Sequence, residues 1–473
     1  MFFSQSKKLL LFSTIGYLFI IYFFNQKFHT SLVVFKENIN LYFIYLIFLL
    51  NIAPIIFYFY SKDEKSNLPI FYLSLIYFFF SYTLFFISNS WNVFDEHRLS
   101  EHQNAIEIFL IGIFFYNLGY YLFFSLIKKS KKSLKIFEID NNKELLLLGL
   151  LTLTGVIVCY NIIDLPKYIN GIQQLKYPLL YLSYGFLVLY IFNTQKTISL
   201  YFKILLFLLI LIPIVFDMLA GAFFTPFISV FLNIIFFMYL GQKITKFNLI
   251  SIVSTILILF FIIQIKTPYR NAIWTTENNS TVDKFLIYKS ELYSLLKKFN
   301  FQQPYKINTV SRIFHSYESL VIVVNKTPSD VDYFEGKSYK ILTSKIIPRI
   351  FWKNKPSDVL GNTYGRRYNI ILETDNYTSW NMPVLNEFYV NYGLKGVILG
   401  MFLLGFFFRF ISTFFSIKNN YNTEKIVAFY IFVPLFFLES HLSLMFGALL
   451  QSYVFLLIFF VIYKKVFRLL KII

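Results

Sequence analysis

Arginine is scarce in this chain of 473 residues, and most of it lies in one stretch. Lysine provides most of the other cations, whereas five of the eight arginines fall within residues 267–391. These five are Arg270, Arg312, Arg349, Arg366 and Arg367. A guanidinium stays charged and pairs with two phosphate or carboxylate oxygens at once. The set therefore points to an anion held by this stretch, although each arginine alone is equally well explained as a loop cation or an ion-pair partner.

For Arg270 and Arg312, the neighbouring residues suggest more specific roles. Arg270 follows directly on a long apolar block, so its guanidinium would lie at the level of lipid headgroups. There it would either contact a lipid-linked phosphate or snorkel to the interface. Arg312, His315 and Glu318 are spaced by three and would share one face of a helix. We favour an anion-contacting role for Arg312 and the solvated side of an amphipathic helix for His315 and Glu318.

Acidic groups and a histidine stand where the chain enters or leaves apolar blocks. Asp217, Glu439 and His441 lie near the ends of such blocks, where ionisable groups are costly and usually face a cavity. Glu387 stands just before the chain enters another block and is placed to act as general base on a sugar hydroxyl. Pairing with a loop arginine explains Glu387 equally well. Tyr389 would stack on a sugar or belong to an interfacial aromatic belt.

Several classes of chemistry lack their motifs. The single cysteine, Cys159, rules out an intrachain disulfide and a cysteine-based metal cluster. Phosphate-binding glycine loops, zinc-binding His-Glu-x-x-His segments and Gly-x-Ser-x-Gly nucleophile turns are missing, so we expect no metal and no cofactor. The net charge of +19 collects mainly in short connections between apolar blocks, as topology signals do, and no nucleic-acid-binding module is visible.

The elements that position these residues are membrane-spanning helices. The chain is 57% hydrophobic and only 15% charged, and its apolar residues form long blocks. Because a helix needs roughly 20 apolar residues to cross the hydrocarbon, the blocks predict an all-α polytopic membrane protein with about twelve transmembrane helices. We expect these spans near 9–24, 39–60, 68–88, 105–127, 144–163, 177–193, 200–218, 223–240, 249–266, 392–413, 426–440 and 445–463.

Lysine and arginine in the short connections predict the orientation. They are about threefold more frequent on the side that holds both termini, so both termini are expected in the cytoplasm. The chain then divides into nine spans in 1–266, a large extracytoplasmic loop at 267–391, and three spans with a basic tail in 392–473. The loop is far longer than connections without a function usually are. It holds three tryptophans and an amphipathic stretch at 309–325, so we expect it to be folded into short helices.

Two stretches of the loop resemble the Wzy-type polymerases of bacterial O-antigen and capsule repeat units. The first reads Ile-Pro-Arg-x-x-Trp-x-x-Lys-Pro over 347–356, and the second reads Glu-x-Tyr-x-Asn-x-Gly-x-x-Gly over 387–396. The resemblance implies a fold similar to the GT-C class of membrane glycosyltransferases in the bacterial inner membrane. It also implies a metal-independent enzyme that joins undecaprenyl-diphosphate-linked oligosaccharides, a donor and an acceptor, on the outer face. Membrane lipids and a chain-length regulator are the other expected partners.

The resemblance also suggests roles for individual residues. Cations must stabilise the diphosphate as it leaves, and Arg349 is our first choice, with Arg270 and Arg312 beside it. Glu387 would be the base, with His441 and Asp217 in reserve. The residues that we assign to substrate contact are Arg366, Arg367, Lys355, Trp352, Tyr339, Tyr389 and His315.

Three other functions fit parts of the same pattern. An O-antigen ligase, which passes the chain to lipid A, would need the same phosphate-binding groups and would differ only in its acceptor. A flippase or transporter for the lipid-linked repeat would carry its charges around a cavity within the spans and would have short outer loops, which is the reverse of this pattern. A scaffold of a polysaccharide assembly complex would tolerate the loss of Arg349.

Overall fold

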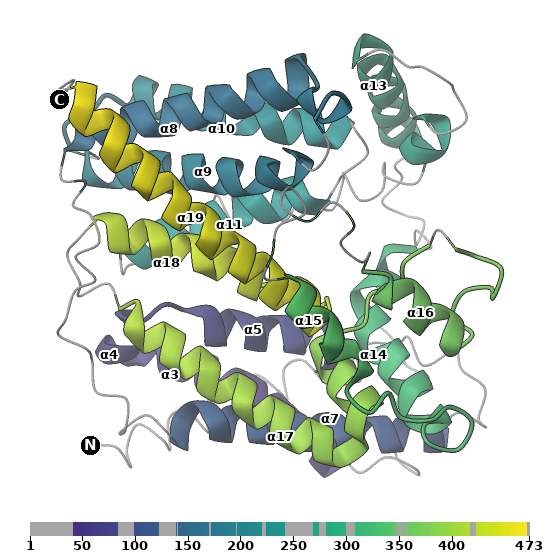
Figure 1. Cartoon of the computed structure of the whole chain (residues 1–473). Helices are drawn as coiled ribbons and strands as arrows, with labels where there is room; N and C mark the ends of the chain where they lie inside the picture. Colours follow the sequence, from purple (N-terminus) through teal and green to yellow (C-terminus); the bar gives the residue numbers. More distant parts are fainter. Residues whose placement is uncertain are drawn as a thin grey trace. The chain divides into compact units, whose positions relative to one another are not determined.

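The computed structural model describes most of the chain from residue 41 onward. The described residues are 41–83, 99–122, 139, 141–169, 172–194, 196–219, 224–241, 268–273, 281–298, 308–345, 347, 352, 354, 358–376, 378–416 and 422–470. Their regular structure is entirely helical, and they contain no β-strand (Figure 1). The expected all-α architecture is thereby confirmed for this part of the chain.

The helices fall into those that precede the long connection at 267–391, the expected outer loop, and those from it onward. Those before the long connection are α3 (Leu41–Tyr60), α4 (Lys62–Lys65), α5 (Ile70–Phe78), η1 (Phe79–Thr83), α7 (Leu99–Leu122), α8 (Asn142–Val156), η4 (Ile157–Ile162), η5 (Leu165–Lys167), η6 (Ile172–Leu175), α9 (Lys176–Asn193), α10 (Leu200–Leu219) and α11 (Phe224–Gly241). Those from the long connection onward are α13 (Thr281–Lys298), α14 (Asn308–Lys326), η7 (Lys337–Tyr339), α15 (Lys340–Lys345), α16 (Leu360–Arg367), α17 (Val384–Phe414), α18 (Asn422–Leu435) and α19 (Leu442–Leu470).

Six described helices are long and apolar enough to cross a membrane, not the expected twelve. They include α3, α7, α10, α17 and α19, and the sixth is α8 continued by the π-helix η4. The chain is a multi-pass membrane protein. Other expected spans form helices that miss these requirements of length or composition, such as α18 with 14 residues and α9 with its four tyrosines. The spans expected at 9–24 and 249–266 lie outside the described residues.

The chain forms two compact units that do not follow its order. Unit 1 contains residues 1–132, 310–418 and 431–453, and unit 2 contains the remainder. The long connection is therefore shared, because 267–309 belongs to unit 2 and 310–391 belongs to unit 1.

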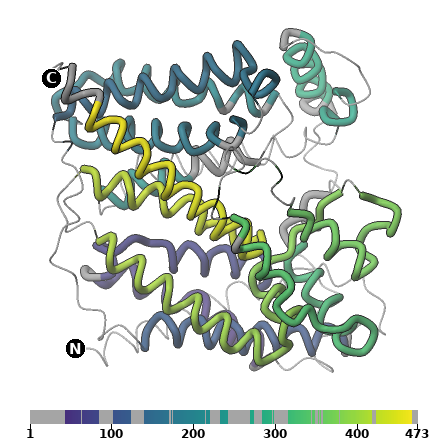
Figure 2. The backbone as a smooth tube through the Cα atoms, in the orientation of Figure 1, coloured from purple at the N-terminus to yellow at the C-terminus, as the bar shows by residue number. Residues whose placement is uncertain are grey.

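In unit 1, α17 packs closely along α7 because glycines remove side chains from the contact. A Cβ atom added at Gly405 would overlap the carbonyl oxygen of Tyr116, and one added at Gly119 would overlap that of Phe402. Small residues allow this backbone approach between membrane helices. The backbone tube shows α14, α15 and α16 gathered at the end where α17 begins (Figure 2).

A buried ion pair fastens the opposite part of α17. The guanidinium of Arg409 donates to Glu64 at 2.8 Å, and both side chains are almost fully buried. Glu64 also accepts hydrogen bonds from the hydroxyls of Tyr72 (2.7 Å) and Tyr120 (3.0 Å). A buried charge pair is retained only when such extra hydrogen bonds satisfy it. These contacts join α4, α5 and α7 to α17.

Unit 2 is built around α8, α9, α10 and α11. Its buried ion pair joins Lys176, the first residue of α9, to Asp217 near the end of α10. At the same end of α10, the hydroxyl of Tyr269 donates to the carbonyl of Leu219 at 2.7 Å. This bond attaches the short helix at 268–273 to the end of a candidate span.

Candidate functional site

The site begins with a break in α17. Tyr392 and Gly393 leave the helical conformation, and the φ angle of +60° at Gly393 is one that other residues adopt only with strain. A Cβ at Gly393 would also lie 2.6 Å from the hydroxyl of Tyr333. The turns that precede the break are bonded to the long connection, since the N–H of Phe334 donates to the carbonyl of Val390 at 2.9 Å. The break therefore separates the first two turns of α17, which are bonded to the long connection, from the remainder of the helix.

Glu387 lies in this first part of α17 and is fully buried. Its carboxylate accepts a hydrogen bond from the hydroxyl of Ser338 (2.6 Å) and another from the backbone N–H of Leu442 (2.6 Å). The Ser338 oxygen in turn accepts from the amide of Asn391 at 2.9 Å. Leu442 is the first residue of α19, and the positive end of a helix dipole favours a carboxylate there. Glu387 thus joins the starts of α17 and α19.

A second carboxylate, Asp358, lies at the same helix start. Its Oδ2 atom is 2.8 Å from the Lys345 ammonium, 3.1 Å from Nε2 of His441 and 3.0 Å from the hydroxyl of Ser443. Burial by itself would raise the pKa of Asp358. The hydrogen bonds from His441 and Lys345, together with their charges, outweigh burial and hold this pKa well below its usual range.

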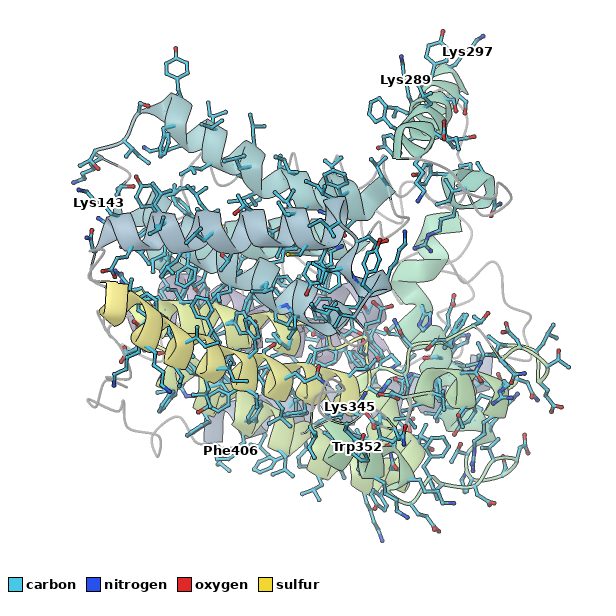
Figure 3. The ribbon with its side chains drawn as sticks, turned by 45° about the horizontal axis from the view of Figure 1, so that its top comes forward. Lys143, Lys289, Lys297, Lys345, Trp352 and Phe406 are labelled. Atoms are coloured by element: carbon cyan, nitrogen blue, oxygen red, sulfur yellow. The ribbon has the colours of Figure 1, made fainter. Side chains whose placement is uncertain are left out.

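The two carboxylates form one buried network because their partners are consecutive in sequence. His441 contacts Asp358, and the next residue, Leu442, donates to Glu387. We call Lys345, Asp358, Glu387 and His441 the acid–base network; all four side chains belong to unit 1. In Figure 3, Lys345 is labelled near the beginning of α19, and its side chain packs against Gly447 of that helix.

The tautomer of a neutral His441 ring follows from its partner. An ionised Asp358 only accepts hydrogen bonds, so the neutral ring carries its hydrogen on Nε2 and has its lone pair on Nδ1. Among the described residues, the ring makes one hydrogen bond, the one to Asp358. Nδ1 is therefore the ring atom that can accept a proton. The described residues contain no group of three or more metal-ligating side chains.

Arg366 and Arg367 are engaged by the long connection itself. Arg366 donates to the carbonyl of Glu373 (3.4 Å) and to the side chain of Asn376 (3.0 Å). Arg367 donates to the carbonyl of Asp332 at 2.8 Å, and its guanidinium lies over the ring of Phe334. Both arginines thus hold turns of the connection together, and among the described residues no hydrogen bond or ion pair joins either one to the acid–base network.

Of the ring-bearing residues expected to contact substrate, three pack against other residues of the protein and one is exposed. The ring of His315 stacks on Trp380 at 4.3 Å between centroids, and the hydroxyl of Tyr389 donates to the carbonyl of Thr327 at 3.4 Å. Tyr339 lies beside Tyr392, and burial raises its pKa above the usual range. Trp352 is exposed and is labelled in Figure 3.

The remaining candidates lie elsewhere or outside the described residues. Asp217 and Arg270 belong to unit 2, where Asp217 is paired with Lys176. Arg312 lies in α14, and its side chain is outside the described part. Arg349 and Lys355, the cations of the Ile-Pro-Arg stretch, are also outside it.

Sequence reasoning missed Lys345, Asp358 and Ser338 as members of the site. Asp358 follows the Lys-Pro pair of the Ile-Pro-Arg stretch by two positions, and Ser338 follows Gly336 by two positions, ahead of that stretch. Neither residue belongs to a motif whose spacing predicts a role in catalysis or binding. Only their contacts with Glu387 and His441 identify them.

A family model described as "Domain of unknown function (DUF8712)" matches residues 115–471. Neither a curated protein nor a solved structure matches the chain. The family match contains every residue of the acid–base network and α17 with its break. Because it also extends over well over half of the sequence, the chain belongs to the DUF8712 family.

Proposed function

We propose that the protein is a membrane glycosyltransferase that polymerises oligosaccharide repeat units linked to a polyprenyl diphosphate. The observation that carries the proposal is the His441–Asp358 pair, held at 3.1 Å where α19 begins and next to the start of α17. A base oriented by a carboxylate at the end of membrane helices is what transfer to a sugar hydroxyl from a lipid-held donor requires.

The proposed step balances as follows. Nδ1 of His441 takes the proton of the acceptor hydroxyl, whose oxygen forms a bond to the anomeric carbon of the donor sugar. The bond between that carbon and the diphosphate oxygen breaks, and the polyprenyl diphosphate leaves with the electron pair. Cations stabilise the leaving charge, and Arg349 remains our first candidate for this role. Energy for the step is stored in the donor, so no nucleotide is consumed.

In this mechanism Glu387 is an anchor and His441 is the base. Both oxygens of the Glu387 carboxylate already accept short hydrogen bonds, from Ser338 and Leu442. The Nδ1 atom of His441 has a lone pair to offer. Asp358 holds the imidazole in the required tautomer, and Lys345 keeps Asp358 ionised.

The features of the whole chain support the same class of activity. Six candidate spans place the chain in a membrane. The long connection contributes Ser338 to the start of α17, and Lys345 and Asp358 to the start of α19. The Ile-Pro-Arg and Glu-x-Tyr stretches favour the Wzy-type polymerases and a fold similar to the GT-C class. On this proposal the protein acts at the outer face of the bacterial inner membrane.

The test is a gene deletion complemented by variants, with gel analysis of the polysaccharide. We expect the deletion to leave single repeats attached to lipid A or to abolish capsule, and we expect His441→Ala not to restore the polymer. Asp330→Asn removes an exposed carboxylate of the same connection and should restore it. Complete loss of repeats from lipid A would indicate a ligase, and repeats stranded inside the cell would indicate a flippase. Either result would overturn the proposal.

A further inference from the structure

Helix α13 exposes the side that a soluble helix would bury. Phe285, Leu286 and Tyr293 are 53%, 54% and 69% exposed, whereas Tyr288, on the side toward Tyr269, is less exposed. An isolated apolar side chain on a surface is ordinary, but three large ones on one face of a single helix mark a contact surface.

Two exposed lysines lie on the same face of α13. Leu286, Lys289, Tyr293 and Lys297 follow one another at spacings of three, four and four, so they form one stripe along the helix. Figure 3 shows Lys289 and Lys297 projecting outward from α13. Apolar side chains with lysines between them suit a surface that is apolar inside and anionic at its rim.

The other side of α13 attaches the helix to the end of a candidate span. The Tyr288 ring meets Tyr269 edge to face, with 5.7 Å between centroids, and Tyr269 donates to Leu219, the last residue of α10. The candidate span in α10 ends at Asp217, so α13 lies at the depth where the hydrocarbon ends. All of these residues belong to unit 2.

The orientation of α13 is also the one expected of a helix at the membrane surface. In Figure 1, α13 runs across the common direction of α8 and α10 and does not continue it. Both α8 with η4 and α10 are long and apolar enough to cross the bilayer. A helix that runs across them at their end lies along the membrane surface.

We propose that α13 is an interfacial helix that binds the surface of the lipid bilayer. Phe285, Leu286 and Tyr293 enter the boundary between headgroups and acyl chains. Lys289 and Lys297 extend to the phosphates of anionic lipids, as lysines of surface-lying amphipathic helices do. The proposal does not depend on the glycosyltransferase activity.

The experiment uses the full-length protein in lipid vesicles. Cys159 is the only cysteine, so Cys159→Ser gives a background in which Leu286→Cys or Tyr293→Cys carries one spin label. Collision with oxygen, which partitions into lipid, is compared with collision with a nickel chelate, which stays in water. Glu291→Cys is the matched control, because Glu291 is partly exposed and lies on the opposite face of α13 from Leu286 and Tyr293.

We expect the ratio of oxygen to nickel collisions at positions 286 and 293 to exceed that at position 291 several-fold. In vesicles that contain phosphatidylglycerol, Lys289→Glu with Lys297→Glu should lower the ratio at position 286, and in phosphatidylcholine alone it should not. Equal ratios at positions 286 and 291 would place the helix in water. Protection of position 286 from both reagents would show that protein covers this face. Either result would overturn the proposal.

Discussion

His441 and Asp358 are 83 positions apart in the sequence, yet Nε2 of the histidine lies 3.1 Å from Oδ2 of the aspartate. The pair joins the long connection to the first turn of α19. Because the carboxylate is ionised, it determines which ring nitrogen carries hydrogen and which is free to act as a base. The contact therefore has a structural consequence and a chemical one, and the two can be measured separately.

Replacement of the imidazole tests the chemical role. We expect His441→Ala to lower the rate of polymerisation by a factor on the order of 10² to 10⁴, the usual contribution of a positioned general base. The rate is measured with purified protein in vesicles that contain a lipid-linked repeat unit. His102→Ala is the control, since His102 is a buried histidine of the same unit that bonds to Tyr317. A folded His441→Ala protein with unchanged rate would exclude His441 as the base.

Stability as a function of pH tests the ion pair of Asp358. The folded-state pKa of this carboxyl lies well below its usual value of 3.8, because bonds from His441 and Lys345 outweigh its burial. Its contribution to stability is therefore present above pH 3.8 and is lost as the pH falls through the folded-state pKa. At neutral pH we expect Asp358→Asn to lower the free energy of unfolding by about 1–3 kcal/mol.

The measurement is the thermal midpoint of both proteins in detergent micelles across acidic and neutral pH. The difference between the midpoints should be constant at neutral pH and should shrink in strongly acidic solution. A difference that is greatest in acid would contradict the assignment of Asp358 as the ionised partner.

Two substitutions of Glu387 separate an anchor from a base. Glu387→Gln keeps an acceptor for Leu442 and a polar group for Ser338, so we expect a folded protein that retains most of its activity. Glu387→Ala leaves both buried donors without this acceptor and should lower the free energy of unfolding by about 2–4 kcal/mol. Size-exclusion profiles and polymerisation rates distinguish the cases. If Glu387→Gln were folded but inactive, Glu387 would be the base, as first expected from the sequence.

Alanine at the glycines between α7 and α17 tests their close packing. In Gly405→Ala the new methyl group would meet the backbone carbonyl of Tyr116, which has no rotamer by which to move away. We expect a loss of at least about 1 kcal/mol of stability, as is typical of overpacked cores. Gly155→Ala is the matched control, because a Cβ there meets nothing within 4 Å. Equal thermal midpoints for the two variants would show that the helices do not approach so closely.

The sequence by itself determined the class of the protein and some of its site. Long apolar blocks such as 41–60 report membrane helices directly, because the cost of exposing polar backbone in hydrocarbon acts on each segment separately. The positions of Glu387 and His441 beside such blocks marked them as candidates for the same local reason. The number of spans was not determined, since apolar composition does not tell a full crossing from shorter helices such as α5 and α18.

Only the tertiary structure decided what these residues contact. Asp358 and Lys345 have ordinary sequence contexts, and their role follows from packing that brings the long connection onto the first turn of α19. The same packing gave Glu387 two donors and assigned Asp217 to a separate ion pair with Lys176. Hydrogen bonds and ion pairs between distant positions depend on angstrom-scale distances that neither periodicity nor composition encodes.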